Sequence, residues 1–87
     1  MQRRKGFPKK TAEECFGQAL RERRKENGFT QEELAHRSGY HSTYIGQLER
    51  GLKSPSLRAI VNLAAVLNTF GSDLLKRVEV LMVQDAS

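Results

Sequence analysis

The residues that could act as nucleophiles, metal ligands or acid–base groups are few. Cys15 is the only cysteine, and the two histidines, His36 and His41, fall on different predicted helices. The sequence contains no Cys–Cys pair, no His-Glu-x-x-His motif and no glycine-rich phosphate loop, which are patterns that gather metal ligands or bind phosphate. It therefore gives no support for an enzyme, and it implies no cofactor, no metal and no small-molecule ligand.

A stripe of hydrogen-bonding side chains lies between residues 42 and 50. On a helix, Thr43, Gln47 and Arg50 are spaced i, i+4 and i+7, so they share the face opposite the apolar residues Ile45 and Leu48. Glutamine amides pair well with adenine, and threonine offers a hydroxyl and a methyl group to a base edge. The stripe therefore has the chemistry of base recognition, provided that the helix exists and is held in place.

The turn signals of the sequence predict five short helices. Thr11 with Glu14 and Thr30 with Glu33 are capping boxes, which predict helices over 12–25 and 31–38. A third helix is expected over 42–50, between Gly39 and Gly51. A fourth begins at Ser56, where apolar residues recur at helical spacing (Leu57, Ile60, Val61, Ala64 and Leu67), and a fifth spans about 72–82. The expected fold is a compact all-α bundle.

Four small or apolar residues constrain the second and third helices together. Ala35 is small enough for close helix contact, Gly39 suits a turn that needs a positive φ, and Ile45 and Leu48 form the inner face of the third helix. This Ala-x3-Gly-x5-Ile-x2-Leu pattern is typical of a DNA-binding helix-turn-helix, here residues 31–50.

The sequence between Phe16 and Leu75 resembles the XRE family, the phage lambda-type repressor and Cro class of helix-turn-helix proteins. The matching segments are Leu20-Arg21, Arg24, Thr30 to Ala35, Leu48 to Gly51, Pro55 to Leu57, Ala64 and Leu67. The resemblance implies a five-helix lambda-repressor-like domain that binds double-stranded DNA as a homodimer and regulates transcription. Restriction–modification controller proteins and small phage-type regulators share this size and build.

The resemblance implies base contacts for three residues, and positions around the polar stripe predict phosphate contacts for others. Ser42, Thr43 and Gln47 are expected to contact bases, and residues around them are expected to contact phosphates: Gln31, His41, Tyr44, Arg50 and Lys53. For Tyr44 the alternative is packing, and for His41 it is a neutral helix cap. The family pairs the residue at Glu49 with an arginine of the first helix, here Arg24, and this ion pair is expected to lock the third helix in place.

The fifth helix carries two overlapping apolar rows, one more than a small core needs. Their residues are Leu74, Leu75, Val78, Leu81 and Met82, and we expect a second copy of the chain to cover part of this surface. Phe70 stands where the family usually has a polar cap, so Ser72 is the alternative cap of this helix.

The length and charge distribution of the chain predict one domain with a basic N-terminal arm. The chain has 87 residues and a net charge of +5, enough for one domain, placed at 11–83 with a tail at 84–87. Residues 1–10 carry five bases and no acid (Arg3, Arg4, Lys5, Lys9 and Lys10), whereas the other 77 residues are balanced. We therefore expect a flexible basic arm drawn to polyanions, with a solubilising tail as the alternative.

The length of the apolar runs and the single cysteine indicate the cellular compartment of the protein. The longest apolar runs have four residues, too short to span a membrane, and one cysteine fits a reducing cytoplasm. The leading hypothesis is a cytoplasmic, sequence-specific transcription regulator or repressor, a dimer on an inverted-repeat operator. An antitoxin-like or adaptor module that acts through a protein partner is the alternative.

Overall fold

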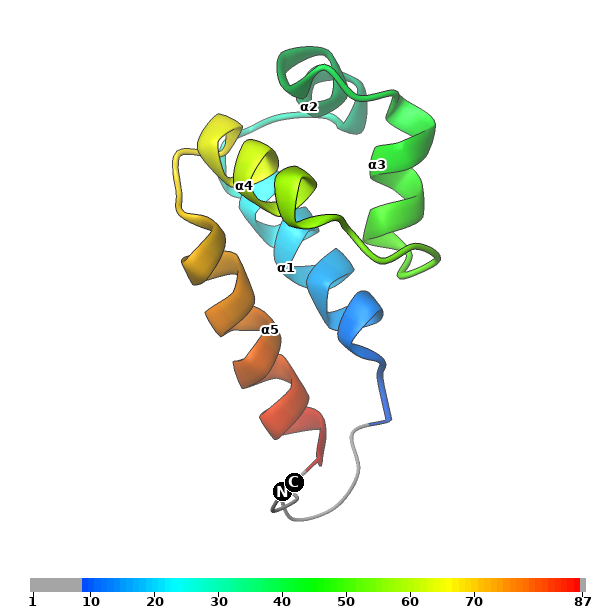
Figure 1. Ribbon diagram of the computed structural model, residues 1–87, viewed down its shortest axis with the longest axis vertical. Helices are drawn as coiled ribbons and strands as arrows, with labels where there is room; N and C mark the ends of the chain where they lie inside the picture. The colour runs from blue at the N-terminus through cyan, green and yellow to red at the C-terminus, as the bar shows by residue number, and fades with distance from the viewer. Residues whose placement is uncertain (1–8, 87) are drawn as a thin grey trace.

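The computed structural model describes residues 9–86, which form five helices and no strand. The helices are α1 (Ala12–Glu26), α2 (Gln31–Ser38), α3 (Ser42–Glu49), α4 (Leu57–Val66) and α5 (Gly71–Ala86). In Figure 1, α2 and α3 lie at one end of the molecule, α4 crosses in front of α1, and α5 runs beside α1. The all-α, lambda-repressor-like helix-turn-helix fold is confirmed, and Arg3, Arg4 and Lys5 of the predicted arm lie outside the described residues.

Side-chain caps begin the helices where the sequence predicts them. Thr11 and Glu14 form a complete capping box at α1, and Thr30 and Glu33 form another at α2. The hydroxyl of Ser56 accepts a hydrogen bond from the backbone N–H of Ala59 at 3.0 Å and caps α4. Each cap satisfies an N–H group that has no partner within its helix, so these residues define where each helix begins.

All five helices contribute to one core. Leu20, Leu34, Ile45, Leu48 and Leu63 are fully buried at its centre. Gly39 ends α2 with a φ of 78°, and Ala35 is 4 % exposed, so both constraints expected of the helix-turn-helix are present. The core therefore buries the inner face of α3 and leaves its polar stripe free.

The apolar row of α4 divides between the core and the surface. Ile60, Ala64 and Leu67 are buried, together with Leu63, whereas Leu57 is 76 % and Val61 is 54 % exposed. The five residues that recur at helical spacing span a wider arc than α2 and α5 cover. Two of them are therefore left on the outer side of α4.

Helix α5 is longer than expected and begins differently. It runs from Gly71 to Ala86, so residues 84–86, which were expected in a tail, belong to this helix. The carboxylate of Asp73 accepts hydrogen bonds from the backbone N–H of Phe70 at 3.3 Å and from the hydroxyl of Thr69 at 3.2 Å. The start of α5 is therefore stabilised by Asp73 and not by Ser72.

Three of the five residues expected to meet a second copy, Leu74, Val78 and Leu81, lie in the core of the single chain. These three residues are between 3 % and 8 % exposed and pack within the chain's own core, because α5 lies along α1. Leu75, at 42 % exposed, remains accessible, and Met82 is partly buried against the core. One apolar row of α5 closes the core, and the other is only partly available to a partner.

Helices α1 and α3 approach each other at Gly17, a feature that the sequence analysis did not identify. A Cβ atom at Gly17 would lie 2.4 Å from the carbonyl oxygen of Leu48 and 2.5 Å from that of Glu49. These are backbone atoms of α3, so they cannot turn aside as a flexible side chain can. Gly17 therefore sets the distance between α1 and the helix that carries the polar stripe.

We expect Gly17→Ala to lower the free energy of unfolding by about 2–3 kcal/mol, as in overpacked cores. Gly46→Ala is the matched control, because its added Cβ would meet nothing closer than 3.7 Å. That change should raise the free energy of unfolding by about 0.5–1 kcal/mol, since alanine favours a helix interior over glycine. Urea denaturation of both variants measures the difference, and equal stabilities would contradict the close α1–α3 contact.

Candidate nucleic-acid interface

A buried ion pair joins α1 to the end of α3. The Nε and Nη2 atoms of Arg24 donate to the two carboxylate oxygens of Glu49 at 2.6 and 3.0 Å. The side chains are only 10 % and 3 % exposed. Hydrogen bonding to Glu49 raises the pKa of Arg24 above its ordinary value, against the opposing effect of burial. The structure therefore contains the ion pair that was expected between these two residues.

The same network extends to the start of α2. Arg24 donates a further hydrogen bond from Nη1 to the carbonyl oxygen of Phe29 at 2.8 Å. The Nε2 atom of Gln31 donates to Oε1 of Glu49 at 3.0 Å. The carboxylate of Glu49 therefore links α1, α2 and α3 at the point where their ends meet. Hydrogen bonds to an ionised acceptor are stronger than those between neutral groups.

The polar stripe of α3 faces away from the core. Thr43 and Arg50 are exposed, and Ser42 and Gln47 are half-buried, while Ile45 and Leu48 on the opposite side are fully buried. Arg50 follows the last turn of α3, and its Nε atom donates to the carbonyl oxygen of Gly46 at 3.2 Å. The structure thus brings together the side chains that the sequence predicts for base contact.

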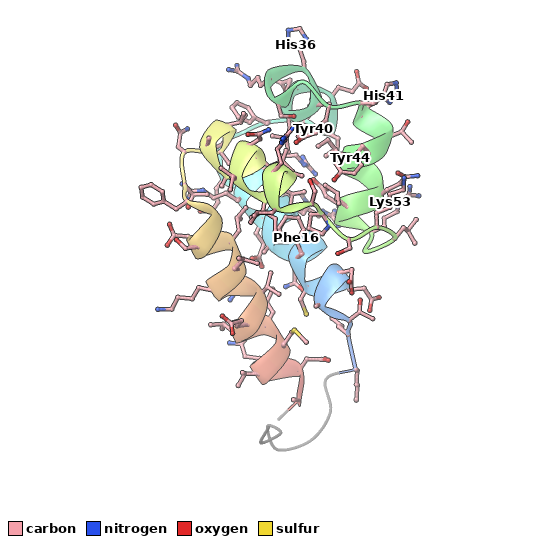
Figure 2. All side chains as sticks on the ribbon, viewed as in Figure 1. Phe16, His36, Tyr40, His41, Tyr44 and Lys53 are labelled. Carbon is pink, nitrogen blue, oxygen red and sulfur yellow. The ribbon has the colours of Figure 1, made fainter. Side chains whose placement is uncertain are left out.

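His41 and Tyr44 resolve into different roles. Nδ1 of His41 accepts a hydrogen bond from the backbone N–H of Thr43 at 3.1 Å, so His41 is the N-cap of α3. Tyr44 packs against the core with its ring centroid 5.2 Å from that of Tyr40, and burial raises the pKa of its hydroxyl. Figure 2 shows both tyrosines between α3 and α4, with His41 and Lys53 nearer the outer side. The geometry of Tyr44 favours packing over phosphate contact.

Arg23, a second basic residue of α1 besides Arg24, is hydrogen-bonded within the fold, whereas Arg21 and Lys25 are exposed. Arg23 donates from Nε to the carbonyl oxygen of Leu67 at 3.0 Å and from Nη2 to that of Asn68 at 2.8 Å. These bonds satisfy carbonyl groups at the end of α4, a role that no sequence pattern indicated. Lys9 and Lys10 are exposed, and the backbone N–H of Lys10 donates to the carboxylate of Asp85 at 2.7 Å.

Comparison with known families agrees with this arrangement of helices. A family model described as Helix-turn-helix (HTH_3) matches residues 20–70, which include α2, α3 and α4. The chain belongs to this family. It is a DNA-binding transcription regulator of the XRE class and not an enzyme.

Individual relatives cover most of the chain. It is 41 % identical over 64 residues to the control protein C.SmaI of Serratia marcescens, covering 74 % of this chain and 76 % of that one. The crystal structure of the clp gene regulator ClgR from C. glutamicum superposes with a TM-score of 0.81 and 32 % identity, over 86 % of this chain and 96 % of that one. The biofilm regulator SinR, solved in complex with DNA, superposes with a TM-score of 0.67 and 34 % identity, over 69 % and 97 %.

Within residues 9–86, no helix has the length and apolar content that crossing a membrane requires. The same residues contain no cluster of three or more histidine, cysteine, aspartate or glutamate side chains that could hold a metal ion.

We expect Glu49→Ala to lower the free energy of unfolding by about 3–5 kcal/mol, because it leaves Arg24 buried without its partner. The matched control is Glu22→Ala. Glu22 pairs with Arg77 on the surface, where the side chains are 38 % and 42 % exposed, and its loss should cost less than about 1 kcal/mol. Thermal melts followed by circular dichroism compare the two, and similar melting temperatures would mean that the Arg24–Glu49 pair does not stabilise the fold.

Proposed function

We propose that the chain is a sequence-specific regulator that binds an inverted-repeat operator as a homodimer. The observation that carries this proposal is the exposed polar stripe of α3, on a helix whose other side is buried and whose end is held by Arg24 and Glu49. Each copy places α3 in a major groove, with the two grooves about 34 Å apart on one side of the duplex.

Base contacts come from Ser42, Thr43 and Gln47. Threonine and serine hydroxyls serve either donor or acceptor groups, and the glutamine amide suits adenine. Lys53, exposed in the loop after α3, contacts a phosphate, and Lys9 and Lys10 add basic charge before α1. Each phosphate neutralised adds about −0.9 to the slope of log affinity against log salt concentration.

The second copy docks on the outer surface of α4 and the start of α5. Four exposed apolar residues form this α4–α5 face: Leu57, Val61, Phe70 and Leu75. The start of α5 lies against α4, because a Cβ at Gly71 would be 3.2 Å from Cγ2 of Ile60 and 3.9 Å from Cα of Val61. An apolar notch of about 160 Å³ beside Leu75, lined also by Phe16 and Ile60, extends the same surface.

A second copy is the occupant that fits the rest of the proposal. A two-fold symmetric operator needs two recognition helices in fixed relative positions, and a self-complementary patch supplies this geometry. The relatives support regulation as the role: C.SmaI is a control protein and ClgR is a gene regulator.

Selection of bound duplexes from a random DNA library at about 0.15 M salt tests the function. We expect enrichment of an inverted repeat whose half-sites lie about ten base pairs apart. Enrichment of a single unrepeated site would overturn the dimeric operator. Binding without enrichment would overturn sequence-specific recognition and favour a module that acts through a protein partner.

We expect Val61→Asp to convert the dimer into a monomer, because it places a charge in the centre of the α4–α5 face. Val83→Asp is the matched control: Val83 is a similarly exposed valine, but it lies near the end of α5. Sedimentation equilibrium at several protein concentrations measures the association. A dimer that survives Val61→Asp and is lost in Val83→Asp would place the interface at the other end of α5.

A further inference from the structure

A cleft opens between the first turn of α2 and the outer side of α3. Its lining includes Gln31 and Glu32 from α2, and Ser42, Thr43 and Gly46 from α3, with Arg50 at its end. Gly46 forms the floor on the α3 side. A Cβ there would meet only the Oε1 atom of Gln31 at 3.7 Å and an Nη2 atom of Arg50 at 3.9 Å. An amide oxygen and a guanidinium nitrogen therefore flank the bare backbone of Gly46.

The orientation of the Gln31 amide follows from Glu49. A carboxylate only accepts hydrogen bonds, so the group that faces it must be the NH₂ of the amide, and Nε2 of Gln31 donates to Oε1 of Glu49 at 3.0 Å. Turning the amide over would bring two acceptors together. Glu49 is itself held by Arg24, so Gln31 is committed to present its oxygen, an acceptor, toward Gly46.

Arg50 supplies the complementary donors. Its Nε atom donates to the carbonyl oxygen of Gly46, and this hydrogen bond places the side chain over the glycine. The terminal guanidinium nitrogens are left to donate, and two of them can engage two acceptors at once.

The cleft suits a base edge better than a phosphate. The charges of Arg24 and Glu49 cancel, as do those of Glu32 and Arg50. The net charge of these four groups in and around the cleft is therefore zero. A phosphate has only acceptors, and here it would face the acceptor of Gln31 and the carboxylate of Glu32. The phosphate contact expected of the Gln31 amide, from its place at the start of α2, therefore conflicts with the orientation of that amide.

We propose that Gln31 and Arg50 together read one G·C base pair in each half-site. In the major groove, guanine presents two acceptors, N7 and O6, and cytosine presents the N4 amino donor. Arg50 donates to guanine, and the Oε1 atom of Gln31 accepts from the N4 amino group of cytosine. Because Gly46 has no side chain, the edge of the base pair can come close to the backbone of α3. This proposal rests on the proposed function, since it adds a base contact to the same interface.

The test repeats the random-duplex selection with Arg50→Lys, which retains the positive charge and loses the planar fork of donors, and with Arg50→Ala, which loses both. We expect the wild-type protein to prefer G·C at one position per half-site by about 5- to 150-fold, the range of a good bidentate contact. In Arg50→Ala this preference should fall by about tenfold or more, while preferences at other positions stay unchanged. In Arg50→Lys, whose ammonium can still donate to guanine, it should fall less, and the salt slope should stay unchanged. Lys53→Ala is the matched control, with weaker binding at all sequences and unchanged preferences.

A chemical substitution in the DNA provides an independent measurement. Replacing the guanine at that position with 7-deazaguanine removes N7, so the wild-type protein should bind at least about fivefold more weakly. Arg50→Ala, which has no donor at this position, should hardly distinguish the two duplexes. Gln31→Leu, with its fold checked by thermal melting, should lose the same positional preference.

The outcomes separate the two proposals. If the wild-type protein selects an inverted repeat and Arg50→Ala keeps every base preference, the G·C contact is overturned and the operator proposal stands. A uniform loss of affinity with a flatter salt slope in Arg50→Ala, which removes the charge, would likewise assign Arg50 to a phosphate. If the wild-type protein selects no sequence, both proposals are overturned.

Discussion

The hydrogen-bonded ion pair between Arg24 and Glu49 determines where α3 lies, and the rest of the DNA-facing surface depends on it. Two charges so deeply buried are stable only while they face each other, because either one alone would be strongly disfavoured in the core. The pair therefore constrains α1 and α3 in direction, and Gly17 constrains them in distance. A helix of eight residues is short, and packing together with this network, more than helix propensity, keeps it in place.

Glu49 also connects the core to the surface of the cleft. Its carboxylate accepts from Arg24 inside and from Gln31 outside, so the orientation of an exposed amide is set by a buried charge. Preorganisation of this kind lowers the conformational entropy that a flexible glutamine would lose on binding DNA. Arg50, folded back on Gly46, is preorganised in the same way by a bond to its own helix.

Some apolar side chains of α4 and α5 are buried in the core, and others are exposed. The row Leu74, Val78 and Leu81 packs α5 onto the core, whereas the outer residues of α4 and the start of α5 remain exposed. A small domain has little core to spare, so a partner that covers the exposed row adds to its stability. The α4–α5 face is formed by different helices from those that carry the polar stripe, so it stays accessible when the stripe is occupied.

Much of the architecture was determined by the sequence alone, because it depends on local physics. Capping boxes at Thr11 and Thr30, the glycine at the left-handed turn and the 3.6-residue apolar period are readable from neighbouring residues, as were the polar stripe and, through the resemblance, the Arg24–Glu49 pair. The tertiary structure alone decided which apolar residues of α4 and α5 are buried, that Arg23 closes the end of α4, and that Gly17 permits contact with α3. These features depend on contacts between residues far apart in the chain, such as Arg23 and Asn68, which are 45 positions apart, and no local pattern encodes which of them meet.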